Sequence, residues 1–158
     1  MGELLPSLSE SYPAVPASLR RARRAVTALA IESGATPEQV DAVRLAASEA
    51  LANVVVHAYG DRPGEIHLTA AVAGNELWLL VADDGDGLSG GGGKSGLGLG
   101  LTLIAQACEE LTIVKRSGGG TELRMRFRVG GAVAVDDYER GSVSSARSPA
   151  SSVFSTTR

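Results

Sequence analysis

The spacing of apolar residues changes from a helical period to a strand period near residue 60, and this change is the strongest constraint on the fold. Over residues 16–33 apolar side chains recur at helical intervals, and Gly34 follows as a stop signal. Thr36 and Gln39 flank a proline in the pattern of a helix N-terminus with a capping box. The sequence therefore predicts a second helix over residues 37–58.

Beyond residue 60 apolar residues alternate along the chain, which is typical of strands. They alternate over 66–72 and again over 77–81, with Gly74-Asn75 between the two runs, so we expect a β-hairpin. A glycine-dense loop over 84–95 precedes a predicted helix at 98–109, and a second hairpin is expected over 111–129. The predicted fold class is α+β: a two-layer α/β sandwich with a mixed, mostly antiparallel sheet covered on one face by three helices.

Composition excludes several classes of protein. The chain has 158 residues, which suits one domain with a core of its own. Its net charge of -3 argues against a direct nucleic-acid partner. Its single cysteine, Cys108, excludes a disulfide framework or a multi-cysteine zinc site, and we expect it to be a small core residue. No apolar run reaches the roughly 18 residues of a membrane span and no signal peptide is recognisable, so we expect a cytoplasmic protein without a membrane partner.

The first group of candidate functional residues is Glu49 and Asn53 on the second predicted helix. Four residues apart, they share one helical face in the most apolar part of that helix. Polar groups in such a place are costly unless they are satisfied or used. Glu49 could act as a general base and the Asn53 amide oxygen could bind Mg²⁺, while a structural hydrogen bond is an equally good interpretation.

The second group follows the strand that ends near residue 82. Asp83 could accept a hydrogen bond from an exocyclic amine such as adenine N6, and Gly85 and Gly87 would let a base approach the main chain. An acidic turn is the alternative.

The third group comprises Gly96, Gly98 and Gly100, which open the predicted helix at 98–109. Main-chain N–H groups and the helix N-terminus at such a place can bind phosphate. The neighbouring residues 88–95 match a P-loop except at their first position. A P-loop helix begins at the Lys-Ser step after a parallel strand, whereas here the preceding strand belongs to a hairpin, which disfavours this alternative.

The order of these groups resembles the nucleotide site of the GHKL (histidine-kinase-like) ATPase superfamily. A helix with Glu-x-x-x-Asn comes first, then Asp-x-Gly-x-Gly, then Gly-x-Gly-x-Gly, then Gly120-Thr121 at the last strand. Within it, the Ser-Glu-Ala-x-x-Asn-x-x-x-His-Ala-Tyr stretch at 48–59 is similar to the anti-sigma-factor serine-protein kinases. The resemblance implies a GHKL-like ATP-binding domain over 12–135, preceded by a lead-in at 1–11. The Ser-rich composition of the C-terminal segment, placed at 136–158, predicts a disordered tail.

The resemblance also implies cofactors and residue roles. ATP and Mg²⁺ would be the cofactors, with Glu49 as catalytic base and Asn53 as the metal ligand. Asp83 would bind adenine with support from Thr121, and the glycines of 96–100 would wrap the triphosphate. The residues implied to contact the nucleotide are Asn53, Asp83, Gly85, Gly87, Gly96, Gly98, Gly100, Leu101 and Thr121.

The function that the resemblance implies is a partner switch. The protein would phosphorylate a serine of an anti-anti-sigma (STAS-domain) protein and would also bind a sigma factor, with a homodimer as a further expectation. One departure favours an alternative, because only eight residues separate Gly87 from Gly96, so the lid over the phosphates is short. That alternative is a nucleotide-dependent regulatory binding module without kinase activity.

Other residues receive simpler interpretations. The arginines at 20, 21, 23 and 24 form a solvated basic face or a docking surface for an acidic partner. We expect His57 to be structural, His67 to be exposed on a strand, and Trp78 to cover the outer side of the sheet or contact a partner.

Overall fold

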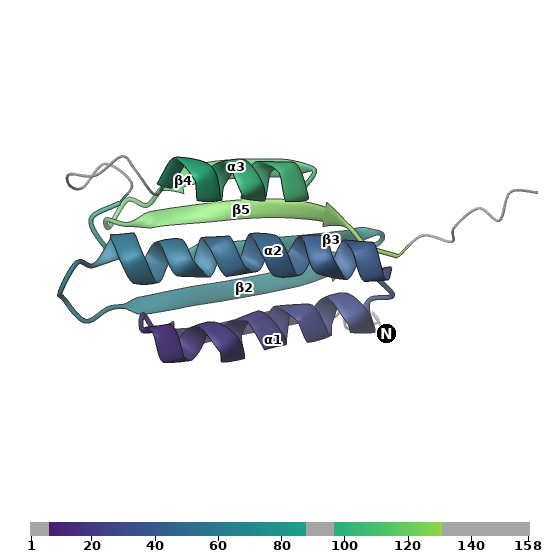
Figure 1. Ribbon diagram of the computed structural model, residues 1–158, viewed down its shortest axis with the longest axis horizontal. Helices are drawn as coiled ribbons and strands as arrows, with labels where there is room; N and C mark the ends of the chain where they lie inside the picture. Colours follow the sequence, from purple (N-terminus) through teal and green to yellow (C-terminus); the bar gives the residue numbers. More distant parts are fainter. Residues whose placement is uncertain (1–6, 88–96, 131–158) are drawn as a thin grey trace, which may run out of the picture.

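The computed structural model describes residues 7–87 and 97–130, which form a sandwich of one sheet and one layer of helices. The sheet has the strand order β1-β2-β3-β5-β4 and every neighbouring pair is antiparallel. Figure 1 shows the helices together on one face of this sheet. The strands are β1 (Ser7–Pro13), β2 (Glu65–Ala73), β3 (Glu76–Ala82), β4 (Glu110–Lys115) and β5 (Thr121–Arg128).

The helical layer consists of α1 (Pro16–Glu32), α2 (Pro37–Asn53) and α3 (Leu97–Ala107). The middle helix, α2, packs between α1 and α3 and rests on the central strands. Aliphatic side chains from both layers form the core, as the low aromatic content requires. Members of this core that are completely shielded from solvent include Val26, Val43, Leu51, Ile66, Leu79, Ile104 and Met125.

The N-terminus of α2 has the predicted capping box. The Thr36 side chain accepts a hydrogen bond from the Gln39 main-chain N–H, and the Gln39 side chain accepts one from the Thr36 N–H at 2.9 Å. The other end differs from the prediction, because α-helical pairing stops at Asn53 and a π-helical turn, η1 (Val54–Ala58), follows. Such turns alter the direction of side chains locally and are frequent at functional sites.

One strand, β1, was not predicted, and most of its residues lie in the expected lead-in at 1–11. Ser7, Ser9 and Ser11 all face solvent, and β1 lies at the edge of the sheet. A polar edge strand lacks the apolar alternation by which strands are recognised in a sequence. Its pairing with β2 is what defines it.

One further expectation about the fold needs correction. The predicted mixed sheet is antiparallel in all four pairings of the described strands. Along α3, Ile104 is buried and Ala107 packs against the core, whereas Ala105 is exposed. The antiparallel partner of β3 also argues against the P-loop alternative.

Several predictions fall outside the described residues. They concern Gly96, the glycine-dense segment 88–95, the first six residues of the lead-in and the Ser-rich segment 136–158. In the ranges that are described, none of the helices combines the length and apolarity needed to cross a membrane.

Candidate functional site

A narrow cavity lies between the C-terminal end of α2 with η1 and the strands β3 and β5. It is small, and the roughly 340 Å³ of empty space within its outline includes open solvent. Most of its lining is apolar, and the polar contributions come from residues that the sequence analysis singled out. The lining residues are Ala50, Asn53, Val54, His57, Ala58, Val81, Asp83, Gly87, Thr121 and Leu123.

Asp83 is the buried acidic residue of this cavity, with 6% of its surface exposed. It directly follows β3, and its main-chain N–H donates to the Thr121 carbonyl at 2.9 Å. Its carboxylate accepts a hydrogen bond from the Gly85 N–H at 2.9 Å. Burial raises the pKa of the Asp83 carboxyl, and hydrogen bonds from the main chain of Gly85 and Thr121 partly oppose that rise. A buried carboxylate with unused acceptor capacity suits a ligand that donates hydrogen bonds.

Two glycines allow the main chain to pack this closely around Asp83. A Cβ atom on Gly85 would lie 2.0 Å from the Ala58 carbonyl oxygen. A Cβ atom on Gly120 would lie 1.9 Å from the Asp83 carbonyl oxygen, and Gly120 also has a positive φ of 87°. Neither position can accept a side chain without movement of the main chain.

Glu49 and Asn53 face the beginning of α3 together. A Cβ atom on Gly100 would lie 3.2 Å from Glu49 Oε2 and 3.4 Å from Asn53 Oδ1, so the glycine lets α3 approach both side chains. The Asn53 side-chain nitrogen, Nδ2, is buried and has no hydrogen-bond partner within the described part of the chain. An unpaired polar atom at the wall of a cavity is costly unless a ligand or water satisfies it.

The other predicted contact residues are distributed around these groups. Gly87 has a positive φ of 73° and lies beside the Thr121 hydroxyl, which a Cβ at position 87 would approach to 3.5 Å. Gly98 is exposed at the first turn of α3, and Leu101 is half-buried against the core. The structure thus brings Asn53, Asp83, Gly87 and Thr121 to one cavity, with Glu49 and Gly100 next to Asn53.

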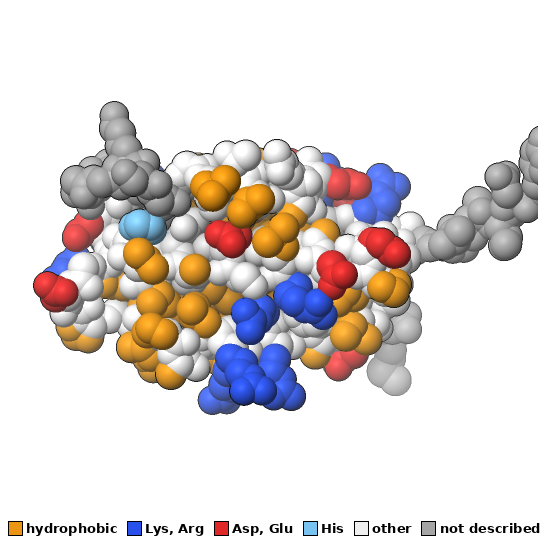
Figure 2. Space-filling model, viewed as in Figure 1, with side chains coloured by type: hydrophobic (Ala, Val, Ile, Leu, Met, Phe, Trp, Pro, Cys, Tyr) orange, Lys and Arg blue, Asp and Glu red, His pale blue; other side chains and the backbone are white. Residues whose placement is uncertain are grey.

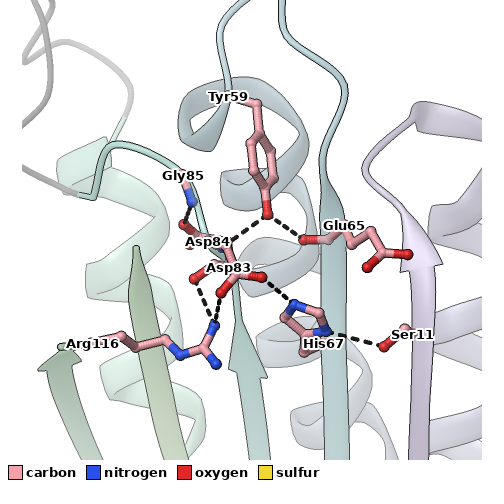
Figure 3. Close-up of polar contacts among 8 residues, drawn as sticks. All are labelled: Ser11, Tyr59, Glu65, His67, Asp83, Asp84, Gly85 and Arg116. Carbon is pink, nitrogen blue, oxygen red and sulfur yellow. Dashed lines mark hydrogen bonds and ion pairs between the residues drawn. The ribbon is translucent and has the colours of Figure 1, made fainter. Parts of the chain in front are cut away.

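Sequence reasoning missed a polar network behind Asp83, which Figure 3 shows in close-up. Arg116, between β4 and β5, donates to the Asp83 carbonyl oxygen at 3.0 Å and to the Asp84 carboxylate. His67 on β2 pairs with the same carboxylate through Nε2, and its Nδ1 lies 3.0 Å from the Ser11 hydroxyl. His67 is therefore half-buried and paired, and the expectation of a merely exposed histidine was wrong.

Tyr59 joins this network from the end of η1. Its hydroxyl donates to the Glu65 carbonyl at 2.6 Å and accepts from the Asp84 N–H at 2.9 Å. The ring is buried, and Gly64 makes room for it, because a Cβ there would lie 2.3 Å from the ring. The hydrogen bond from His67, followed by the effect of Arg116, lowers the pKa of the Asp84 carboxyl.

Most of the chain, including the residues around this cavity, matches a known protein family. Residues 12–127 match the family described as the histidine kinase-like ATPase domain. The chain belongs to this family. The match includes every candidate residue from Glu49 to Thr121.

Curated relatives of the chain carry regulatory names. It is 28% identical over 120 residues to an anti-sigma F factor of Thermoanaerobacter sp. (strain X514), and this alignment covers 69% of the chain and 84% of that protein. It is 29% identical over 146 residues to the serine-protein kinase RsbW of Bacillus licheniformis, and this alignment covers 80% of the chain and 91% of the kinase. A crystal structure of the RsbU and RsbW domains of a Mycobacterium tuberculosis protein is similar with a TM-score of 0.62 and 25% identity. That similarity covers 78% of this chain and 32% of the mycobacterial chain.

The structure also places Trp78, Cys108 and His57. Trp78 lies on the sheet face opposite the helices, where the Arg126 guanidinium stacks over its ring at 5.9 Å. Cys108 packs against the core, and burial raises the pKa of its thiol, as expected of a structural cysteine. His57 is exposed and lines the cavity, so the structure leaves a role beside a ligand open to it.

Proposed function

We propose that this protein is an ATP-dependent serine-protein kinase of the anti-sigma-factor type. In this proposal it phosphorylates a serine of a STAS-domain anti-anti-sigma protein and holds a sigma factor in a partner switch. The observation that carries the proposal is that Glu49 and Asn53 both lie beside Gly100, with Asn53 at the wall of the cavity. The names of the relatives support the same activity.

The residues of the cavity fit ATP and Mg²⁺. Mg²⁺ binds through few protein oxygens together with phosphate oxygens and water. In residues 7–87 and 97–130 no cluster of three or more His, Cys, Asp or Glu could hold a metal alone. The Asn53 Nδ2 atom is buried without a partner among the described residues, and a half-turn of the amide would put its oxygen, a ligand that Mg²⁺ accepts, in that place. The apolar walls beside Asp83 suit a purine base.

Each residue then has a chemical task. When bound, ATP with Mg²⁺ supplies the phosphoryl group and neutralises its charge. The Asp83 carboxylate accepts a hydrogen bond from the adenine amine, and the Asn53 amide oxygen holds the metal. The Glu49 carboxylate accepts the proton of the acceptor serine hydroxyl as that oxygen becomes the nucleophile.

The surface of α1 supports binding of protein partners. Figure 2 shows Lys and Arg side chains gathered on the helical face of the molecule, beside hydrophobic ones. Arg20, Arg21 and Arg24 line one groove there, and Arg23, Ile31 and Arg44 contribute to another. A basic surface of this kind favours partners with acidic segments and accelerates their association. A homodimer stays a prediction, and we place the protein in the cytoplasm, where ATP and sigma factors occur.

Transfer of labelled phosphate tests the proposal directly. The protein is incubated with γ-labelled ATP, Mg²⁺ and each STAS-domain protein of its genome, and the same STAS protein with its acceptor serine replaced by alanine is the control. Label on the parent STAS protein alone supports the kinase. ATP binding and sigma-factor binding without transfer to any STAS protein would instead support the regulatory binding module, which the short segment between Gly87 and Gly96 favours.

A further inference from the structure

Arg116 is the charged residue that holds the main chain at Asp83 from outside the cavity. Its Nη1 donates to the Asp83 carbonyl oxygen at 3.0 Å and also to the Asp84 carboxylate, so one guanidinium spans two consecutive residues. Asp83 itself does not use its side chain in either bond. The Arg116 side chain is about one third exposed and comes from the β4–β5 connection, as Figure 3 shows.

Contacts other than that with Arg116 also restrict movement of the Asp83 main chain. Its N–H is bound to Thr121, and Gly120 packs against its carbonyl so closely that a Cβ would lie 1.9 Å away. The next residue is also held, because His67 pairs with the Asp84 carboxylate and the Tyr59 hydroxyl accepts a hydrogen bond from the Asp84 N–H. Arg116 therefore completes a set of contacts that determines where the Asp83 carboxylate points.

We propose that Arg116 is a positioning residue for adenine recognition: it fixes the Asp83–Asp84 main chain so that the Asp83 carboxylate meets the exocyclic amine of the base. This inference rests on the proposed nucleotide function of the cavity. Arg116 also supplies positive charge near a buried carboxylate, which favours the ionised, hydrogen-bond-accepting form of Asp83. Both effects act on the contact with the amine and leave the phosphate contacts unchanged.

Comparison of two nucleotides separates positioning from general stability. ATP carries the exocyclic amine, whereas purine riboside triphosphate lacks it and is otherwise alike. We expect Arg116→Gln to weaken ATP binding about tenfold, the effect of losing roughly one charge-assisted hydrogen bond, while affinity for purine riboside triphosphate stays unchanged. The matched control is Arg124→Gln, which removes an arginine of β5 that pairs with Glu122 at 2.5 Å on the same sheet.

Two further variants make the test independent of folding. Arg116→Lys keeps the charge, and because both hydrogen bonds of Arg116 come from one nitrogen, a lysine ammonium has the donors to replace at least one of them. We therefore expect a smaller loss of ATP affinity than for Arg116→Gln, and the melting temperature of the parent. In a double-mutant cycle, Asp83→Asn with Arg116→Gln should bind ATP no more weakly than Asp83→Asn alone, because both changes remove one contact.

The outcomes distinguish this inference from the proposed function. Equal weakening of both nucleotides by Arg116→Gln, or unchanged ATP affinity, would overturn the positioning role while leaving the nucleotide site intact. A parent protein that binds the two nucleotides equally would overturn the adenine contact of Asp83 and the inference with it. A parent that binds neither would overturn the proposed function itself.

Discussion

Gly85 and Ala58 are in direct main-chain contact, although one follows β3 and the other ends η1. A Cβ atom on Gly85 would lie 2.0 Å from the Ala58 carbonyl oxygen, and the same oxygen accepts a hydrogen bond from the Asp86 N–H at 2.9 Å. This contact joins the helix that carries Asn53 to the segment that carries Asp83. The two halves of the cavity are therefore held in register by backbone atoms.

Gly85→Ala should separate those halves. The added methyl group has no space, and the required shift breaks the Asp86 hydrogen bond, so we expect a loss of about 1 to 3 kcal/mol in the free energy of unfolding. ATP affinity should fall as well, because Asn53 and Asp83 no longer face one cavity. Chemical denaturation and calorimetric titration measure the two effects.

The control is Gly118→Ala, since a Cβ at that position meets nothing within 4 Å. Equal behaviour of the two variants would contradict the importance of the contact.

Asp83→Asn should raise the melting temperature of the protein and lower its affinity for ATP. Burial raises the pKa of Asp83, so the ionised carboxylate destabilises the fold at neutral pH, and this cost disappears as the pH falls through the raised pKa. Asparagine carries no such charge, and we expect a melting temperature a few degrees above that of the parent at neutral pH. ATP affinity should fall about ten- to a hundredfold, because a charge-assisted hydrogen bond contributes roughly 1.5 to 3 kcal/mol. Calorimetry that finds unchanged ATP affinity would exclude Asp83 as the adenine contact.

Asp84 should stabilise the fold in a pH-dependent way. His67, then Arg116, lowers its pKa, so the carboxylate contributes stability above its unfolded pKa, and that stability is lost as the pH falls through the lower folded value. The difference in unfolding free energy between the parent and Asp84→Asn should be fully present at neutral pH and vanish well below about pH 4. Urea titrations at several pH values measure it.

Asp41→Asn is the matched control, because it removes a carboxylate from an exposed pair with Arg44 on α2. Such pairs contribute only about 0 to 1 kcal/mol. A difference for Asp84→Asn that persists unchanged in acid would show that its charge is not responsible.

Asn53→Ala should abolish the Mg²⁺ dependence of ATP binding. The change removes the amide oxygen and also the unpaired buried nitrogen, so the fold should keep its stability. Titrations with ATP in Mg²⁺ and in a chelator measure the dependence. If Mg²⁺ tightens ATP binding equally in the variant and the parent, Asn53 is not the ligand.

Glu49→Gln should separate binding from phosphoryl transfer. Glutamine keeps the shape of glutamate and one of its two acceptor oxygens but cannot accept a proton, and general-base assistance is worth about 10² to 10⁴ in rate. We expect ATP and sigma-factor affinities like those of the parent, with STAS phosphorylation slowed at least about a hundredfold, as a single-turnover assay would show. Equal rates would make Glu49 a structural residue.

Local sequence was sufficient for much of this protein. The capping box of α2, the burial of Ala22, Val26, Leu29 and Ala30 on α1, and both hairpins follow from interactions between residues close together in the chain. The grouping of Asn53, Asp83 and Thr121 was suggested by the order of short motifs. The family match over residues 12–127 confirms the family that this order indicated.

Only the tertiary structure decided how the site is supported. Arg116 lies 33 positions from Asp83 and meets it because β5 pairs antiparallel with β3, which no local spacing of an arginine reveals. Ser11 becomes part of a strand and meets the His67 ring only when β1 joins the edge of the sheet, and His67 meets Asp84 only through the pairing of β2 with β3. Capping, helical periodicity and turns involve residues a few positions apart, so they can be predicted from the sequence. Close main-chain contacts and ion pairs between distant residues depend on the order and register of the strands, which only the tertiary structure fixes.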